Sequence, residues 1–263
     1  MNYKAICETL RFLALKSGKV ILDIYNSNNV EVFVKSDNSP VTIADKKADE
    51  IITNGLKNYF PEIPIITEEQ VKSHVLKHSI FFIVDPLDGT KEFIEGRRDF
   101  TVNIALVSHG DPVRGIVYAP ARNRLFYNNE NGEAVEETGF FSVSEMGSIK
   151  RIKTALSDNT ALKVVASKSH RDKKTDEYIS NYSCAEFISA GSSLKFCLIA
   201  TGEADLYPRF GPTMEWDTAA GHAVLSAAGG RVLQAENKKP LKYGKPNYKN
   251  PHFIADSSSV ILR

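Results

Sequence analysis

Residues 79–93 read SIFFIVDPLDGTKEF, and the rest of the chain can be placed around them. The apolar, β-favouring run at 80–84 predicts a buried strand. Asp85 and a proline follow directly, and because proline supplies no N–H to a sheet, we expect the strand to end there. Asp88 follows, and a Gly-Thr pair then leads into a short polar segment typical of a helix start. The stretch therefore predicts two carboxylates at the C-terminal end of a buried strand.

This strand end carries groups that bind hard cations and phosphate. The carboxylate oxygens of Asp85 and Asp88 and the carbonyl oxygen of Leu87 are ligands that Mg²⁺ accepts. Backbone N–H groups near Gly89 and Thr90, at a helix start, suit a phosphate oxygen. The alternative is an ordinary turn, since Asp, Pro and Gly are common turn residues.

Two acidic positions lie upstream of this loop. A helical pattern of apolar residues follows SPVTIAD, so Thr42 is a plausible helix cap and Asp45 falls in the first turn. Taken alone, Asp45 is explained by a capping box with Thr42. The apolar run at 63–66 then predicts a short strand that delivers Glu68 and Glu69 to its end, although adjacent acids usually form a solvated surface pair.

The order of strand and helix signals predicts an α+β half followed by an α/β half. From residue 100, apolar runs alternate with turns, which predicts an antiparallel meander, and in the second half strand and helix signals alternate, which predicts a mixed α/β sheet. We expect the halves to span residues 1–150 and 151–263. Near the end, Asp217 precedes an alanine-rich helix that it could cap, and residues 236–250 predict a solvated loop.

Composition limits the class of protein. The 33 basic and 32 acidic side chains give a net charge of +1, so there is no general field that would attract nucleic acid. Cys7, Cys184 and Cys197 are far apart among apolar or helical neighbours, which predicts buried free thiols and a reducing cytoplasm. No segment is typical of an export signal or a membrane span, although peripheral contact with the inner membrane stays open.

Four separated motifs identify a family: SPVTIAD, ITEE, DPLDGTKEF and EWDTAAGHA. Together they resemble the inositol monophosphatase superfamily of Mg²⁺-dependent, lithium-sensitive phosphatases. The stretches SKSHRD, GSSLKFC and LYPRFGPTMEWDTAAGHAV, with Lys91 and Glu92 after the DGT triplet, resemble more closely its CysQ-type branch, the 3′(2′),5′-bisphosphate nucleotidases. The resemblance covers nearly the whole chain and implies a layered αβαβα sandwich.

The resemblance implies a metal site with two or three Mg²⁺ ions. The metal ligands that it implies are Glu68, Asp85, Asp88, Asp217 and the Leu87 carbonyl. It also implies that Asp45 accepts a hydrogen bond from Thr90, which orients the attacking water, so the catalytic residues would be Asp45, Glu68 and Thr90. The implied reaction is an in-line displacement without a covalent phosphoenzyme, in which the metals activate water and neutralise the departing oxygen. His170 and His222 are therefore not expected to act as nucleophiles.

The substrate implied by the resemblance is adenosine 3′,5′-bisphosphate, cleaved at its 3′-phosphate to AMP and phosphate, with its sulfated analogue as a second substrate in sulfur metabolism. The cations of Lys195 and Arg209 suit the 5′-phosphate that is not cleaved, although both could equally be surface charges. The full set of expected substrate contacts is Glu68, Leu87, Asp88, Gly89, Thr90, His170, Ser192, Lys195, Arg209 and Asp217.

Two other functions stay open at this point. One is a phosphatase of the same superfamily that acts on inositol monophosphate, inositol bisphosphate or fructose 1,6-bisphosphate. The other is a non-catalytic sensor that binds the nucleotide bisphosphate without cleaving it. We expect a small-molecule substrate rather than nucleic acid, and a monomer or weak dimer.

Overall fold

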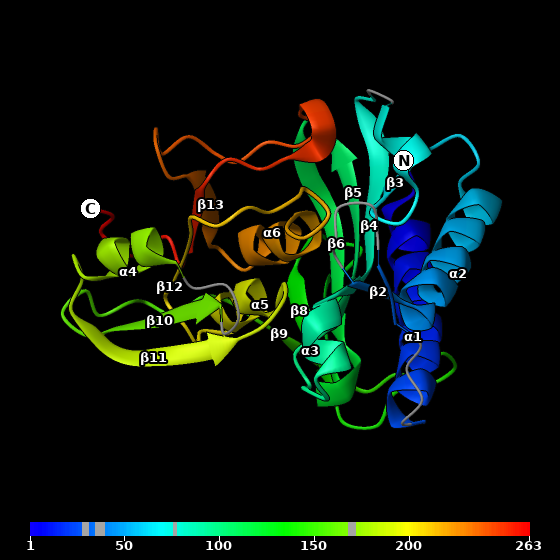
Figure 1. Ribbon diagram of the computed structural model, residues 1–263, viewed down its shortest axis with the longest axis horizontal. Coiled ribbons are helices and arrows are strands. Elements are labelled where there is room, and N and C mark those ends of the chain that lie inside the picture. The colour runs from blue at the N-terminus through cyan, green and yellow to red at the C-terminus, as the bar shows by residue number, and fades with distance from the viewer. Residues whose placement is uncertain (28–31, 35–39, 76–77, 168–171) are drawn as a thin grey trace.

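The computed structural model describes residues 1–27, 32–34, 40–75, 78–167 and 172–263, which form five layers (Figure 1). α1 (Tyr3–Asn26) and α2 (Ile43–Tyr59) cover one face of a seven-stranded sheet. α5 (Leu194–Ala200) and α6 (Ala219–Ala227) lie between that sheet and a five-stranded sheet, and α4 (Lys173–Ile179) lies on the outer side of the smaller sheet. The predicted αβαβα sandwich is confirmed.

The seven-stranded sheet forms most of the first half of the chain. Its order is β3-β4-β5-β6-β7-β8-β9, with β3 and β4 parallel and all later neighbours antiparallel, so the predicted meander is confirmed. Its strands are β3 (Ile65–Thr67), β4 (Ile80–Asp88), β5 (Thr101–Ser108), β6 (Asp111–Ala119), β7 (Arg124–Asn128), β8 (Ala134–Thr138) and β9 (Ser148–Arg151). A separate hairpin joins β1 (Val32–Val34) and β2 (Pro40–Thr42).

The end of β4 differs from the prediction. We expected the strand to stop at Asp85, but pairing with β5 resumes at Asp88, opposite Thr101. The register shifts between Asp85 and Asp88, so the intervening Pro86 and Leu87 lie outside the regular ladder. Proline is tolerated in a bulge because a bulged residue does not need to donate an N–H to the neighbouring strand. The bulge also changes the direction of the neighbouring side chains.

The five-stranded sheet belongs to the second half and has the order β11-β10-β12-β14-β13. β10 is parallel to both β11 and β12, whereas β14 is antiparallel to both β12 and β13, so the predicted mixed sheet is confirmed. The strands are β10 (Leu162–Ser167), β11 (Cys184–Ala190), β12 (Leu206–Arg209), β13 (Arg231–Gln234) and β14 (Phe253–Asp256). The sequence patterns did not predict β13.

Residues 236–250 are only partly the solvated loop that we expected. Leu241, Tyr243 and Tyr248 from this segment are buried. Lys245 forms an ion pair with the buried carboxylate of Glu215, with 2.6 Å between Nζ and Oε1. The segment is therefore packed against the chain just before α6. Burial of its aromatic side chains stabilises this packing, although its many lysines are typical of an exposed loop.

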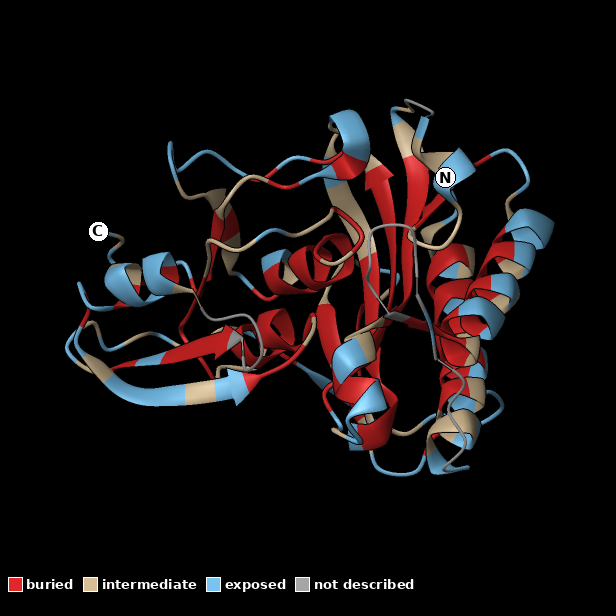
Figure 2. Cartoon of the chain, in the orientation of Figure 1, coloured by how far each residue is buried: buried red, intermediate tan, exposed pale blue. Residues whose placement is uncertain are grey.

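The apolar core lies on both sides of the seven-stranded sheet. Figure 2 shows buried residues concentrated on this sheet and on the helices that flank it. α1 and α2 supply one apolar cluster, α5 and α6 supply a second, and a smaller third cluster lies under α4. No helix in the described residues is long and apolar enough to cross a membrane. All three cysteines are free, and Cys7 and Cys197 are buried, but Cys184 is only partly buried, contrary to expectation.

Candidate active site

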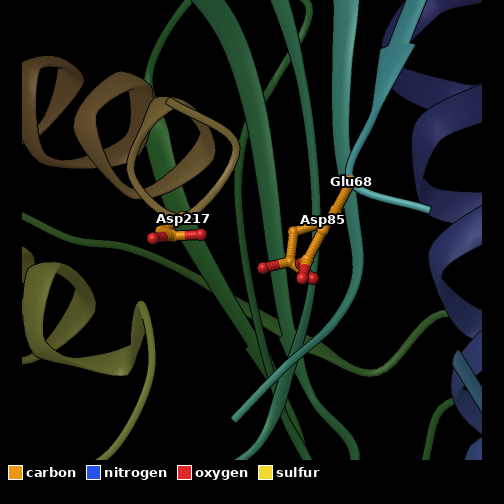
Figure 3. A group of neighbouring side chains, drawn as sticks. All are labelled: Glu68, Asp85 and Asp217. Carbon is orange, nitrogen blue, oxygen red and sulfur yellow. The ribbon is translucent and has the colours of Figure 1, made fainter. Parts of the chain in front are cut away.

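Three carboxylates from distant parts of the chain meet in space. One oxygen atom of each of Glu68, Asp85 and Asp217 lies within 4.8 Å of the others. Glu68 directly follows β3, and Thr67 pairs with Val84 in the parallel strand β4, so Glu68 and Asp85 emerge at the same edge of the sheet. Asp217 approaches them from the loop that leads into α6 (Figure 3).

Asp217 is not the cap of α6. Thr218 occupies the cap position, and the Asp217 carboxylate instead accepts a hydrogen bond of 2.8 Å from the Met214 N–H. Burial raises the pKa of Asp217 well above its usual value, and the nearby charges of Asp88 and Glu68 raise it further. A partly buried carboxylate held next to other carboxylates is unfavourable unless a cation or a proton compensates the charge.

Asp88 lies in the same cleft but outside the cluster of three. Its Oδ2 accepts hydrogen bonds from the Ser193 N–H at 2.7 Å and from the Asn103 side chain at 3.4 Å. Burial raises the pKa of Asp88 to about 6, although the charge of Lys195 and the Ser193 N–H act in the opposite direction. The structure thus brings all four predicted carboxylate ligands into one cleft. Glu68, Asp85 and Asp217 form the tight cluster, and Asp88 lies outside it.

Asp45 has both of the roles considered from the sequence. It completes a capping box, since its Oδ2 accepts hydrogen bonds from the Thr42 N–H at 2.7 Å and from the Thr42 hydroxyl at 2.6 Å. Its other oxygen, Oδ1, accepts a hydrogen bond of 3.1 Å from the Thr90 hydroxyl. Burial raises the pKa of Asp45, against the opposing effect of these hydrogen bonds. The capping box therefore fixes the carboxylate that accepts the hydrogen bond from the Thr90 hydroxyl.

The DGT turn depends on the backbone freedom of Gly89. Gly89 has a φ of +91° and caps α3 (Thr90–Ile94). A side chain at this position would meet the Asp99 carbonyl oxygen at 3.0 Å. The glycine allows the turn that sets the direction of Thr90 and of the Leu87 carbonyl. The Leu87 carbonyl also accepts a longer hydrogen bond, of 3.3 Å, from the Thr90 hydroxyl.

The cluster of three carboxylates fits a hard divalent cation. Carboxylate oxygens are the preferred protein ligands of Mg²⁺, and three of them from separate elements can share one ion. Burial raises the pKa values of Asp88 and Asp217, and the charge of Glu68 raises both further, so a cation between these carboxylates would be favourable. The bound metal would supply the missing positive charge.

A cleft of about 330 Å³ lies beside the carboxylates and is large enough for a small organic ligand. All the predicted contacts that the structure describes line it, and it also includes residues that we did not predict. His170 lies outside the described residues. The lining residues are Glu68, Asp85, Leu87, Asp88, Gly89, Thr90, Lys91, Glu92, Ser192, Lys195, Phe196, Tyr207, Arg209, Pro212, Thr213, Asp217 and Thr218.

The cleft also carries two cations. Lys195 is buried with 4% of its surface exposed, and its Nζ donates a hydrogen bond of 2.5 Å to the Ser192 carbonyl. Burial lowers the pKa of Lys195 to about 8, and Arg209 lowers it further, although Asp88 opposes this effect. The Arg209 Nη2 donates to the Pro212 carbonyl at 3.1 Å, but its buried Nε has no hydrogen-bond partner among the described residues. Lys195 is therefore not a solvated surface charge, whereas Arg209 is only partly buried.

His222 is unsuited to a nucleophilic role. It is buried in α6, and its Nδ1 lies 3.0 Å from the Tyr243 hydroxyl. Burial lowers its pKa to about 3, and His222 is not among the residues that line the cleft beside the carboxylates. That His222 carries out no covalent chemistry stays a prediction.

Comparison with known proteins gives one consistent result. The family model described as the inositol monophosphatase family matches residues 3–261. The chain is 44% identical over 248 residues, 92% of its length and 95% of the relative's, to the 3′(2′),5′-bisphosphate nucleotidase CysQ of Escherichia coli K12. It is 31% identical to the CysQ of Haemophilus influenzae, with coverage of 92% and 89%.

Solved structures give the same result. A crystal structure of CysQ from Bacteroides thetaiotaomicron, described as a bacterial member of the inositol monophosphatase family, matches with a TM-score of 0.83 and 40% identity, covering 97% of each chain. An IMPase from Thermotoga maritima matches with a TM-score of 0.76 at 23% identity, covering 94% of this chain and 90% of that one, which supports the fold alone.

Proposed function

This chain belongs to the inositol monophosphatase family, and from that premise we propose that it is a 3′(2′),5′-bisphosphate nucleotidase. Its substrate is adenosine 3′,5′-bisphosphate, from which it releases the 3′-phosphate and leaves AMP, and the sulfated analogue is a second substrate. The observation that carries this proposal is the meeting of Glu68, Asp85 and Asp217 beside a cleft that also holds Lys195 and Arg209. The three carboxylates suit a metal ion, and the two cations suit the phosphate group that the reaction leaves in place.

Mg²⁺ is the proposed cofactor, in two or three ions per site. The residues that would hold it are Glu68, Asp85, Asp88, Asp217 and the carbonyl of Leu87. When bound, Mg²⁺ supplies Lewis acidity, which favours ionisation of water at neutral pH and neutralises charge on the phosphate and the departing oxygen.

Asp45 and Thr90 position the attacking water. Because the Thr90 hydroxyl donates its proton to Asp45, its oxygen keeps a lone pair with which to accept a hydrogen bond from water. The capping box holds Asp45 from the other side, so the direction of the Thr90 hydroxyl is fixed before substrate binds. We propose that this pair aligns the water with the phosphorus, and that no protein side chain becomes phosphorylated.

Lys195, Arg209 and Ser192 bind the part of the substrate that does not react. The cation of Lys195 and the Nε of Arg209, which has no hydrogen-bond partner in the part of the chain that the structure describes, suit the oxygens of the 5′-phosphate. Ser192 has a φ of +50°, which is strained for a residue with a side chain, and its hydroxyl lies 2.7 Å from that of Thr101. We propose that this strained backbone is retained because it places the Ser192 carbonyl where it accepts the hydrogen bond from Lys195. His170 stays a predicted contact of the same kind.

The proposal includes a location and an oligomeric state. Three free cysteines suit a reducing cytoplasm, and we propose that the protein works there as a monomer or weak dimer, with peripheral contact to the inner membrane left open.

The test is phosphate release from adenosine 3′,5′-bisphosphate with Mg²⁺, with and without lithium, beside inositol monophosphate and fructose 1,6-bisphosphate. Asp85→Asn should reduce turnover by orders of magnitude, whereas the matched control Asp23→Asn, at a side chain that is 62% exposed on α1, should leave it unchanged. Faster turnover of inositol monophosphate or fructose 1,6-bisphosphate would refute the proposed substrate. Binding of the nucleotide without phosphate release would make the protein a sensor instead.

A further inference from the structure

His74 contacts both residues that directly precede candidate metal ligands: the backbone of Thr67, before Glu68, and the side chain of Trp216, before Asp217. It lies in a 3₁₀ helix, Val71–Val75, between β3 and β4. Its Nε2 lies 2.7 Å from the carbonyl oxygen of Thr67, the residue before Glu68. Its ring stacks on Trp216, the residue before Asp217, with 4.7 Å between ring centroids and 28° between planes. Because a carbonyl oxygen can only accept, Nε2 carries the proton of this hydrogen bond.

Each of the two segments is anchored separately to its own half of the chain. The Thr67 hydroxyl donates to Asp49 of α2 at 2.5 Å, which fixes the turn before Glu68. Glu215, just before Trp216, accepts hydrogen bonds from the Gly244 N–H at 2.7 Å and the Lys245 N–H at 2.9 Å. These contacts hold each segment in place, but neither set joins one segment to the other.

The contacts of His74 do join them. Its ring also lies 6.2 Å from that of Tyr248, which in turn packs beside Trp216 at 6.4 Å and against Phe81 of β4. The aromatic group thus spans the boundary between the seven-stranded sheet and the loop before α6. Two carboxylates that repel each other need such a support to remain at the separation that a metal ion requires.

We propose that His74 is a positioning residue, which holds the Glu68 and Asp217 carboxylates at a separation that allows one divalent cation to bind both. The hydrogen bond to Thr67 sets the Glu68 turn, and the stack on Trp216 sets the Asp217 loop. This inference rests on the metal site of the proposed function. It differs from ordinary packing because the imidazole needs both its N–H and its ring face.

Three substitutions separate the two contacts. His74→Phe keeps a ring for the stack but removes the N–H, whereas His74→Gln keeps an N–H donor but removes the ring. His74→Ala removes both. The matched control is Val71→Ala, in the same 3₁₀ helix, at a side chain that is 72% exposed. Trp216 is the only tryptophan in the sequence and is 6% exposed, so its fluorescence reports on the stack without interference from other tryptophans.

The primary measurement is Mg²⁺ binding to the full chain by calorimetry, without substrate. His74→Ala should bind Mg²⁺ at least about tenfold more weakly, as is typical when a group that orients a metal ligand is removed. His74→Phe and His74→Gln should each lose part of this affinity, and Val71→Ala should lose none. Trp216 emission should shift to longer wavelength in His74→Ala and His74→Gln and stay unchanged in His74→Phe.

Equal Mg²⁺ affinity in the wild type and His74→Ala would overturn the proposal, even if the variant melts at a lower temperature, because His74 would then contribute packing alone. If His74→Ala does not fold, the Phe and Gln variants decide in its place, and unchanged affinity in both would overturn the proposal. If the wild type itself binds no Mg²⁺, the proposed metal-dependent function fails, which is a different result from a failure of His74 alone.

Discussion

Replacing Asp88 by Asn should make the metal-free protein more stable and the enzyme far less active. Burial raises the pKa of Asp88 from 3.8 to about 6, and repulsion from Glu68 and Glu92 adds to this, whereas Lys195 and the Ser193 N–H oppose it. The ionised carboxylate therefore costs folding free energy in the absence of a metal. Asn removes the charge and keeps an oxygen that can accept the Ser193 N–H.

The size and pH range of the effect follow from the two pKa values. A group whose pKa is raised on folding stabilises the protein fully below the unfolded value, near 4, and this stabilisation is lost as the pH rises through the folded value, about 6. The full shift corresponds to about 3 kcal/mol, and solvent screening of this half-buried side chain reduces it to roughly 1–2 kcal/mol. We expect the variant to melt about 2–8 °C higher at pH 8, with the difference vanishing near pH 4.

The assay is thermal unfolding of both proteins from pH 4 to pH 8, with a chelator and then with saturating Mg²⁺, beside phosphate release. Mg²⁺ should reverse the order of stability, because it binds the wild type more tightly than the variant. Turnover of the variant should fall by orders of magnitude. A variant that is no more stable than the wild type at pH 8 without metal, or that keeps near-normal turnover, would refute this reasoning.

Four further predictions concern the cleft and its support. Because the pKa of Lys195 is about 8, KM for adenosine 3′,5′-bisphosphate should rise above that pH, and Lys195→Arg should remove the rise in a pH series of initial rates. Arg209→Ala should raise KM far more than it lowers kcat, and an equal loss on a substrate without the 5′-phosphate would exclude its assigned role. Gly89→Ala should cost about 1–3 kcal/mol in thermal unfolding, because the new side chain meets the Asp99 carbonyl at a positive φ. His222→Gln should keep turnover within about tenfold, since His222 is buried and does not line the cleft, and a wild-type intermediate phosphorylated on His222 and trapped by rapid quench would contradict this.

Local signals in the sequence were sufficient for most of the fold. The helical pattern that follows SPVTIAD and the Thr42 cap both have their predicted form, because each depends on residues within a few positions of one another. The meander was predictable for the same reason, since turns separate its apolar runs. By contrast, β13 has only four residues, and too few of them alternate for a strand to be distinguished from a loop.

Long-range packing accounts for what the sequence could not predict. The lysines and prolines of residues 236–250 indicated a solvated loop, but Tyr243 and Tyr248 are buried against a distant segment. The same applies to the site. Motifs placed Glu68, Asp85 and Asp217 together, whereas His74 carries no motif, and its link to Trp216 depends on a contact between residues 142 positions apart in the sequence. Glu92 belongs to the DPLDGTKEF motif, and this membership was the signal for its place in the cleft.

The most direct test of the account is a crystal structure of the protein soaked in Mn²⁺, with anomalous scattering used to locate the ions. We expect at least one strong peak within coordination distance of oxygen atoms from Glu68, Asp85 and Asp217, and loss of that peak in Asp85→Asn. Well-ordered carboxylates with no peak between them, in protein that hydrolyses the nucleotide in the same Mn²⁺ concentration, would contradict it.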